Sequence, residues 1–403
     1  MLLKNGRIRV GTELVKKDIL IDGNKIVKIE DYIEGKGIDL KNGYVCPGLT
    51  DLHVHFREPG FENKETILTG SKAAAKGGYT TVFLMPNLNP VPDSIDSLNK
   101  EIEIINNVNL IRCIPYGSVT KGEKGVELAD IEELKTRTKF FSDDGVGVNN
   151  IELLDKALEL VKENDLFIAS HAEDTNYLKN DKRSEYIAVK REIVEAMKYN
   201  VHYHFCHMST IESFKFIKEA QDKGYNITCE VTPHHMFLNE TMINNNPNFK
   251  MNPPLRSEED RKATVQALLS GVAACVATDH APHDLLSKQK EYEKCSNGII
   301  GIETAAPLVY TNLVKTGLMN FEQFERVMSS NALKLAGLEE NKIEVGAIAN
   351  LCVLDIDNIH TYKETEIESK GHNCPYINMS MYGFNTLTIC NGKVVYEKQK
   401  GEI

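Results

Sequence analysis

No stretch of this 403-residue chain approaches the roughly 18 consecutive apolar residues that a membrane-spanning helix needs. The opening residues, MLLKNGRIRVG, are too short and too charged for a secretory signal. No block of basic residues occurs and the net charge is −11, which argues against a nucleic-acid partner. We therefore expect a cytoplasmic protein that binds neither nucleic acid nor a membrane.

The nine cysteines include no C-x-x-C pair. Several of them, Cys46, Cys206, Cys229 and Cys275, lie inside apolar runs. Buried free thiols in a reducing compartment fit this distribution better than disulfides or a thiolate zinc site.

Internal repeats and low-complexity tracts are also missing, and the two ends of the chain resemble each other. Strand patterns with tight-turn signals at Asp22-Gly23 and Asn391-Gly392 occupy both termini. We expect residues 1–46 and 341–403 to form one small β domain, a β-sandwich. Residues 47–340 would form the catalytic domain.

Between the ends, short apolar runs alternate with helical patterns. We expect eight strands, around VCPGLTDLHV, TTVFLMP, NLIRCIPYG, KFFSDD, LFIASH, HYHFCH, NITCEVTP and ACVATD. Helical patterns lie between them, for example ETILTGSKAAAKG, IELLDKALELVKEN, TIESFKFIKEAQDKG and SEEDRKATVQALLSG. Eight successive βα units favour a closed (β/α)8 barrel of the TIM type, an α/β fold, over an open sheet.

Polar residues collect at the ends of these strands, where the chemistry of such barrels lies. The strand ends carry His53 and His55, Asn87, Asp143 and Asp144, His171, His207, His234 and His235, and Asp279, His280 and His283. No strand start has a comparable set. Because these residues lie at strand ends and not at strand starts, the pattern favours a metal site over a rim that is merely polar.

Strand geometry agrees with a metal site. His53 and His55, two residues apart, face the same side of a strand and can converge on one ion. Imidazole and carboxylate ligands without thiolate suit Zn²⁺ and tolerate Mn²⁺ or Co²⁺. Four histidines and two aspartates exceed the needs of one catalytic zinc and suit two ions roughly 3.5–4 Å apart that share a hydroxide. Hydrolysis by metal-activated water, or its reverse, is the expected reaction class.

Other polar residues have simpler readings. Asp143 and Asp144 point to opposite faces, so only one of them can be a ligand. We expect His202 and His204 to lie outside the barrel or in packing, and Lys139 to be structural. His234, His235 and His280 are ambiguous, and His360 and His372 are expected to play no catalytic role.

From about Val45 to Gly337 the chain resembles the amidohydrolase superfamily, and within it the bacterial dihydroorotases of the longer, type I class. The flanking β segments fit as well. The resemblance is carried by PGLTDLHVHFREPG (47–60), GGYTTVFLMPNLNPVPD (77–93), FFSDDGVG (140–147), ASHAED (169–174), CHMST (206–210), EVTPHH (230–235), KMNPPLRS (250–257) and ATDHAPH (277–283).

The resemblance implies reversible ring closure of N-carbamoyl-L-aspartate to L-dihydroorotate plus water, a step of de novo pyrimidine (UMP) biosynthesis. It implies two divalent ions, with Zn²⁺ expected, and a hydroxide that bridges them. His53 and His55 would hold the first ion, His171 and His207 the second, and Asp144 both. Asp279 would bind the first ion and shuttle the proton.

The same resemblance places His55, Arg57, Asn87, Asn252, His283, Asn297 and Gly298 around the substrate. Arg57 follows His55 on the same face, and its guanidinium fork suits a carboxylate. A homodimer or an association with aspartate transcarbamoylase is also implied. Two rival readings stay open: a cyclic-amide hydrolase of the allantoinase or hydantoinase kind, and an inactive scaffold for the transcarbamoylase.

Overall fold

Eight short parallel strands form a closed ring in the middle of the chain. The computed structural model describes residues 1–398. Three hydrogen-bonded strands in the order β6-β7-β8 continue into six in the order β9-β10-β11-β12-β13-β14. The ring strands are β6 (Leu49–Val54), β7 (Tyr79–Leu84), β8 (Arg112–Pro115) with β9 (Gly117–Ser118), β10 (Phe140–Ser142), β11 (Phe167–Ser170), β12 (Tyr203–Phe205), β13 (Ile227–Val231) and β14 (Cys275–Val276).

Two details close the ring. β8 and β9 are one strand bent at Tyr116, because β8 pairs with β7 and β9 pairs with β10. The first and last strands meet where Val54 forms a parallel bridge with His280 and the His55 amide donates to the His280 carbonyl at 2.9 Å. The predicted (β/α)8 barrel is therefore confirmed.

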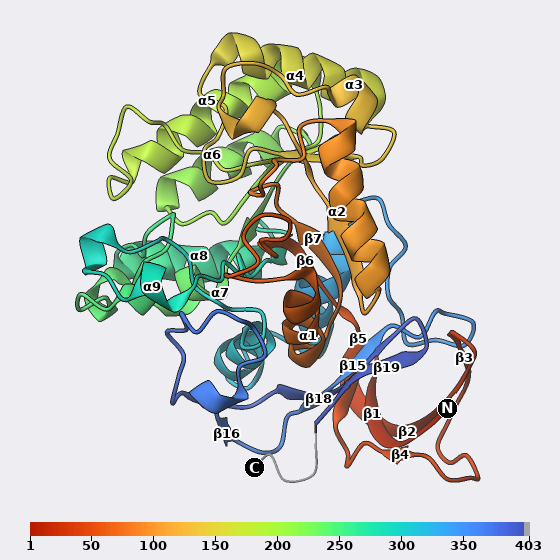
Figure 1. Cartoon of the computed structure of the whole chain (residues 1–403). Coiled ribbons are helices and arrows are strands. Elements are labelled where there is room, and N and C mark those ends of the chain that lie inside the picture. The colour runs from red at the N-terminus through yellow and green to blue at the C-terminus, as the bar shows by residue number, and fades with distance from the viewer. Residues whose placement is uncertain (399–403) are drawn as a thin grey trace.

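Helices surround the barrel, as Figure 1 shows. They are α1 (Ile67–Gly77), α2 (Ile95–Val108), α3 (Ile131–Leu134), α4 (Ile151–Asn164), α5 (Arg183–Tyr199), α6 (Ile211–Asp222), α7 (Pro233–Phe237), α8 (Glu258–Ser270), α9 (Leu285–Lys288), α10 (Ala305–Val309), α11 (Phe321–Glu325) and α12 (Asn331–Leu335), with π-helical segments η5 (Tyr310–Val314) and η6 (Arg326–Ser330). Short 3₁₀ turns are η1 (Lys121–Glu123), η2 (Glu240–Met242), η3 (Pro247–Phe249), η4 (Tyr292–Lys294) and η7 (Glu364–Glu366).

Helix α4 illustrates why these segments are helical and where they pack. The Asn150 side chain accepts hydrogen bonds from the first free amides, and Asp165 ends the helix in the left-handed conformation. The buried side chains recur at helical spacing: Leu153, Leu154, Ala157, Leu158 and Val161. Each fully buried leucine contributes about 1.5–3 kcal/mol, so this stripe holds the helix against the barrel.

Strands from both ends of the chain share one mixed sheet. Its order is β19-β18-β15-β5-β1-β2-β3, with β4 beside β1. The strands are β1 (Leu2–Val10), β2 (Glu13–Asp22), β3 (Lys25–Glu30), β4 (Ile38–Asp39), β5 (Tyr44–Pro47), β15 (Leu351–Asp355), β18 (Phe384–Cys390) and β19 (Lys393–Glu397), while β16 (His360–Thr361) pairs with β17 (Ser380–Met381). The sheet curls over a core of its own that includes Leu3, Ile19, Val45 and Val353.

The predicted first strand is in fact two strands. β5 belongs to the terminal sheet and β6 to the barrel, and the chain passes between them at Gly48. A side chain at Gly48 would collide with Thr80, whose Oγ1 lies 2.3 Å from an ideal Cβ. The Gly48 carbonyl accepts hydrogen bonds from Ser329 Oγ at 2.7 Å and Asn341 Nδ2 at 2.8 Å, which fix this crossing.

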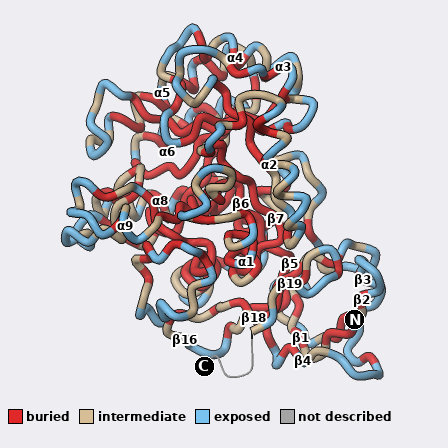
Figure 2. Tube along the Cα trace, viewed as in Figure 1, coloured by how far each residue is buried: buried red, intermediate tan, exposed pale blue. Residues whose placement is uncertain are grey.

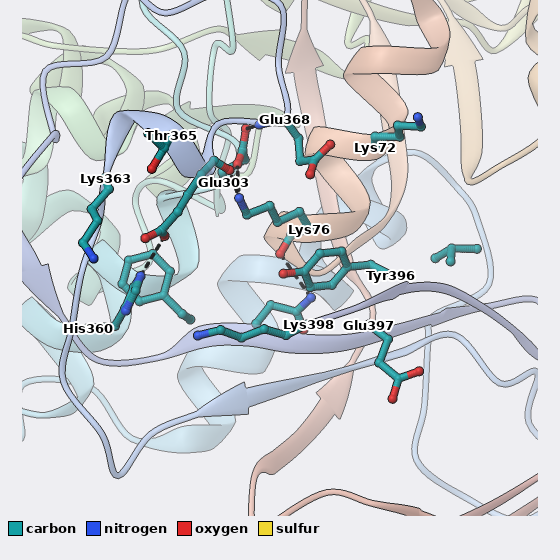
Figure 3. A pocket seen from close by; sticks show the side chains of 14 residues that line it. Lys72, Lys76, Glu303, His360, Lys363, Thr365, Glu368, Tyr396, Glu397 and Lys398 are labelled. Atoms are coloured by element: carbon teal, nitrogen blue, oxygen red, sulfur yellow. Dashed lines mark hydrogen bonds and ion pairs between the residues drawn. The ribbon is translucent and has the colours of Figure 1, made fainter. Parts of the chain in front are cut away.

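A cavity of about 490 Å³ lies where α1, β16, β18, β19 and η7 meet (Figure 3). Charged side chains in it pair with one another: Lys76 Nζ lies 3.2 Å from Glu303, and His360 Nε2 lies 2.7 Å from Glu366. None of its lining residues belongs to the predicted metal site. The cavity is thus a charged seam between the terminal sheet and α1.

The interior of the barrel is buried and aromatic at its base, whereas loops and outer helix faces are exposed (Figure 2). Phe140 contacts both Phe83 and Phe167 there, with ring centroids 4.9 and 5.6 Å apart. Above this layer the barrel becomes polar. Among residues 1–398, no helix is long and apolar enough to cross a membrane.

Candidate metal centre

Five barrel strands deliver histidine and aspartate side chains to one point. His53 lies in β6 and His55 just after it, Asp144 follows β10, and His171 and His207 follow β11 and β12. Asp279 comes three residues after β14. Parallel strands end on the same rim, so residues far apart in the sequence meet there.

The six residues form two groups that could each hold a cation. His53, His55 and Asp279 make one group, and Asp144, His171 and His207 the other. Within each group the ligand atoms lie within 4.8 Å of one another, and every side chain is buried.

Asp144 stands between the groups. Its Oδ1 lies 3.4 Å from His53 Nε2, 3.5 Å from His171 Nδ1 and 3.4 Å from His207 Nε2. Its Oδ2 lies 3.5 Å from His55 Nε2. One carboxylate thus touches all four histidines.

The donor atoms fit a cation. His53 Nε2 and Asp144 Oδ1 are buried and have no hydrogen-bond partner among the described residues. An unpaired buried polar atom is costly, and a divalent ion at this point would satisfy both atoms. The backbone agrees, since His207 and Asp279 have φ of 37° and 47°, and such strain is characteristic of functional sites.

The electrostatics of the cluster also indicate a cation. Burial lowers the pKa of His171, but the Asp144 and Glu173 carboxylates outweigh it and raise that pKa to about 9. Asp144 likewise raises the pKa of His53 well above its ordinary value, against the effect of burial. Burial itself raises the pKa of Asp279 to about 7. Without a metal the cluster therefore holds protons, and a metal would replace them.

The residues predicted to bind substrate border this cluster. The Nε of Arg57 is buried without a partner among the described residues, and Asp279 and Asp144 are the charges that most favour its cationic form. Asn87 Nδ2 donates to the Asp144 carbonyl at 2.7 Å and to Glu123 at 3.1 Å. Burial raises the pKa of Glu123 to about 9, so this carboxyl is neutral at pH 7.

On the opposite side, Asn252 Nδ2 lies 3.1 Å from His171 Nε2. His283 Nε2 donates to the Asn297 carbonyl at 2.6 Å, which leaves its buried Nδ1 without a partner in the described structure. Gly298, with φ of 129°, donates to Lys250 and accepts from Lys288 and Asn373. The Gly298 backbone thus shapes this loop and is already hydrogen-bonded.

His202 and His204 were expected outside the barrel or in packing, and the structure fits the packing alternative. Both rings contact Phe167 at the barrel base, so they face the interior and not the outside. His204 Nε2 lies 3.2 Å from Glu230, whose other oxygen lies 2.8 Å from His53 Nδ1. His207 has a left-handed backbone, with φ of 37°, so the alternation of faces counted back from this residue does not hold.

Sequence reasoning also missed two carboxylates, Glu230 and Glu173. Glu230 supports His53, and Glu173 Oε2 lies 3.1 Å from His171 Nε2. A charged residue inside the apolar strand pattern ITCEV was the available signal for Glu230. Asp143, by contrast, turns away and accepts from the Val119 and Thr120 amides. Lys139 is exposed.

Comparisons with known proteins agree with this geometry. Residues 44–395 match the amidohydrolase family. The chain is 43% identical to a dihydroorotase of Fusobacterium nucleatum over 98% of both chains. It is 38% identical to a dihydroorotase of Pediococcus pentosaceus over 99% of both, and 40% identical to one of Staphylococcus aureus over 99% of this chain and 100% of that protein.

Solved structures share the fold. An L-hydantoinase from Arthrobacter aurescens superposes with a TM-score of 0.88 at 23% identity, over 99% of this chain and 96% of that one. A D-hydantoinase from a Thermus species gives 0.86 at 24% identity, over 98% and 95%. The family match over most of the chain and the full-length relatives lead to one conclusion: this chain belongs to the amidohydrolase family, in the group whose curated members are dihydroorotases.

Proposed function

We propose that this chain is a dihydroorotase, which closes N-carbamoyl-L-aspartate to L-dihydroorotate with loss of water and catalyses the reverse reaction. The step belongs to de novo pyrimidine biosynthesis, in the cytoplasm. The observation that carries the proposal is the convergence of six buried metal-type ligands in a chain with full-length similarity to dihydroorotases.

Two divalent ions, Zn²⁺ by the donor set, would occupy the centre. His53, His55 and Asp279 would hold the first, His171 and His207 the second, and Asp144 both. When bound, the ions supply a water that ionises near pH 7 and neutralise charge on the carbonyl under attack.

Asp279 is the proton carrier of this proposal. In ring closure the ureido nitrogen forms a bond to the side-chain carboxyl carbon, and one carboxyl oxygen leaves as water. The nitrogen loses one proton while the leaving oxygen needs two, so closure consumes a proton overall. A protonated Asp279 delivers a proton in this direction, and an ionised Asp279 accepts one in hydrolysis.

Arg57, Asn87, Asn252 and His283 would bind the substrate around this point, with the loop at Asn297 and Gly298. The guanidinium of Arg57 has a buried, unpartnered Nε among the described residues, which suits the substrate carboxylate. Asn87 and His283 each keep one buried atom free for a ligand, Oδ1 and Nδ1.

A hydantoinase or allantoinase is the competing assignment, because the solved neighbours named above are hydantoinases. Enzymes of that kind generally use a carboxylated lysine where this chain has Asp144. Lys139 is exposed, and Asp144 stands at the centre of the histidines. An inactive scaffold for aspartate transcarbamoylase is disfavoured because all six ligands converge. A homodimer or a complex with that enzyme remains a proposal, to be tested by the subunit mass with and without it.

The decisive experiment compares substrates on the purified, metal-loaded protein. We expect turnover of dihydroorotate and of N-carbamoyl-L-aspartate, with hydantoin and allantoin at least 100-fold poorer in kcat/KM. Preferred turnover of either neutral ring would overturn the assignment, and a well-folded protein with two ions and no turnover would support the scaffold instead.

The Arg57→Gln variant tests how the substrate is recognised. We expect KM to rise with metal content unchanged, because the arginine faces the substrate carboxylate. Losing one partner of a desolvated charge pair costs roughly 2–5 kcal/mol. Steady-state kinetics with metal analysis measures this, and unchanged kinetics would show that the carboxylate is held elsewhere.

A further inference from the structure

Two of the four clustered histidines are hydrogen-bonded to carboxylates. In each of them, the bonded ring nitrogen is the one that points away from the cluster. His53 Nδ1 lies 2.8 Å from Glu230, and His171 Nε2 lies 3.1 Å from Glu173. The Nδ1 atoms of His55 and His207 are buried without a hydrogen-bond partner in residues 1–398. Support of this kind fixes which nitrogen of a ring is free to bind metal.

The two carboxylates have different surroundings. Glu230 is fully buried and is also held by His204. Glu173 lies at the rim, its side chain 11% exposed, with Lys179 Nζ 3.2 Å from its Oε1. The supporting group of His171 is therefore the one within reach of an arriving substrate.

Glu173 also binds a residue of the proposed substrate site. Asn252 Nδ2 donates to Glu173 Oε2 at 2.8 Å, and the same nitrogen lies 3.1 Å from His171 Nε2. One carboxylate oxygen thus meets both the ring and the amide.

His171 Nε2 cannot serve both neighbours at once. If Nε2 carries a hydrogen, it donates this hydrogen to Glu173. The second amide hydrogen of Asn252 then points at another donor and cannot bond to the ring. If Nε2 is bare it accepts from Asn252, and Nδ1 must carry the hydrogen. Nδ1 is the atom that faces the cluster, 2.9 Å from His207 Nε2 and 3.5 Å from Asp144. A cation there requires a bare Nδ1 and hence hydrogen on Nε2.

We propose that Glu173 is a positioning residue that couples metal binding at His171 to substrate recognition by Asn252. It stabilises the tautomer with hydrogen on Nε2, which frees Nδ1 for the ion. In that tautomer the second N–H of Asn252 is released from the ring and turns to a substrate oxygen. Coupling between sites is reciprocal, so bound substrate tightens the second ion by the same factor as the ion tightens substrate.

The coupling rests on the proposed function only in that Asn252 contacts the substrate. The test titrates metal-free protein with Zn²⁺ against a chromophoric chelator. Each titration is run alone and with a saturating equilibrium mixture of dihydroorotate and N-carbamoyl-L-aspartate. In Glu173→Gln we expect the affinity for the second ion to fall 10–100-fold, as for other supporting groups of metal ligands. The tightening caused by the substrate mixture should disappear.

Three variants separate this role from a merely structural one. Asn252→Ala should keep the affinity for both ions, raise KM and lose the tightening. Glu173→Asp restores the charge and should recover part of the metal affinity. Lys179→Met removes only the half-exposed partner of Glu173 and should match the wild type in every readout.

A Glu173→Gln protein that binds both ions like the wild type and keeps the tightening would overturn the proposal. If Glu173→Gln bound metal more weakly but the substrate mixture still raised its affinity for the second ion, the proposed coupling would be overturned. If the wild-type protein failed to turn over dihydroorotate, the proposed function would fall, yet the metal titration without substrate would still decide whether Glu173 supports His171.

Discussion

Asp279 combines an oxygen that faces the histidine cluster with a pKa raised to about 7. Its Oδ1 lies 3.1 Å from His55 Nε2, and burial raises its pKa to about 7. In Asp279→Asn we expect turnover to fall at least 100-fold in both directions, because an amide cannot accept and return a proton. The barrel should persist, since β14 is held by buried apolar residues. The measurement is kcat in both directions on protein saturated with metal.

Two checks accompany that variant. A folded, metal-loaded Asp279→Asn protein with a tenth of wild-type activity would exclude Asp279 as the carrier. In the wild type, hydrolysis needs the ionised carboxylate and should rise with pH, whereas ring closure needs the acid and should rise as pH falls. Bound cations favour the carboxylate, so we expect both inflections at or below pH 7.

The residues named from sequence and those missed differ in a physical way. His53, Asp144 and Asp279 were predictable because strand polarity alone brings strand ends together. Glu173 and Glu230 were not, because their role depends on which ring nitrogen they meet, and this is set by side-chain rotamers and packing. The exterior placement considered for His204 was wrong for a backbone reason: the left-handed conformation of His207 breaks the alternation of faces counted from it.

Among the elements, helices and hairpins follow local rules and were predicted closely. The α4 pattern IELLDKALELVKEN matches the helix Ile151–Asn164, and the Asn391-Gly392 turn joins β18 to β19. The division of the first strand into β5 and β6 was not predictable, because every residue of both halves is buried and no exposed position marks the boundary. Which sheet each half joins is decided by residues some 300 positions later in the chain.

The crossing from β5 to β6 gives a prediction for stability. We expect Gly48→Ala to lower the free energy of unfolding by about 1–3 kcal/mol, because the new methyl group overlaps the Thr80 side chain. Urea denaturation measures the loss. Adding Thr80→Ala removes the two closest atoms and should make the double variant more stable than the sum of the two single effects. Gly301→Ala, which meets only ordinary contacts at 3.5 Å, is the control. Additive effects would show that the crossing is not tightly packed.

The whole molecule should show how protons and metal compete at its centre. The pKa of His171 in the folded, metal-free protein is raised to about 9, above the ordinary 6.5, and that of His53 is raised well above it. The stability that His171 contributes is fully present below pH 6.5 and is lost as pH rises through about 9, and the contribution of His53 is lost in the same direction. A bound ion replaces these protons, so the stability of the loaded protein does not depend on them.

We therefore expect the melting temperature of chelator-stripped protein to fall between pH 7 and 9, while that of loaded protein falls less. Metal should stabilise the fold at both pH values because it binds the folded state selectively, and its effect should be larger at pH 9. Calorimetry at matched ionic strength measures both curves. A metal-induced shift that is equal at the two pH values would contradict this account of the cluster.

The shared sheet also bears on how the protein is made. β5 is hydrogen-bonded on one side to β1 and on the other to β15, which begins 304 residues after β5 ends. At about 5–20 residues per second, the ribosome needs roughly 15–60 s to reach β15 after releasing β5. Throughout that interval one edge of β5, the strand that precedes β6 and its His53, lacks its partner. The nascent chain therefore exposes an unpaired strand edge with which another strand could pair wrongly. The terminal sheet can be completed only near the end of synthesis.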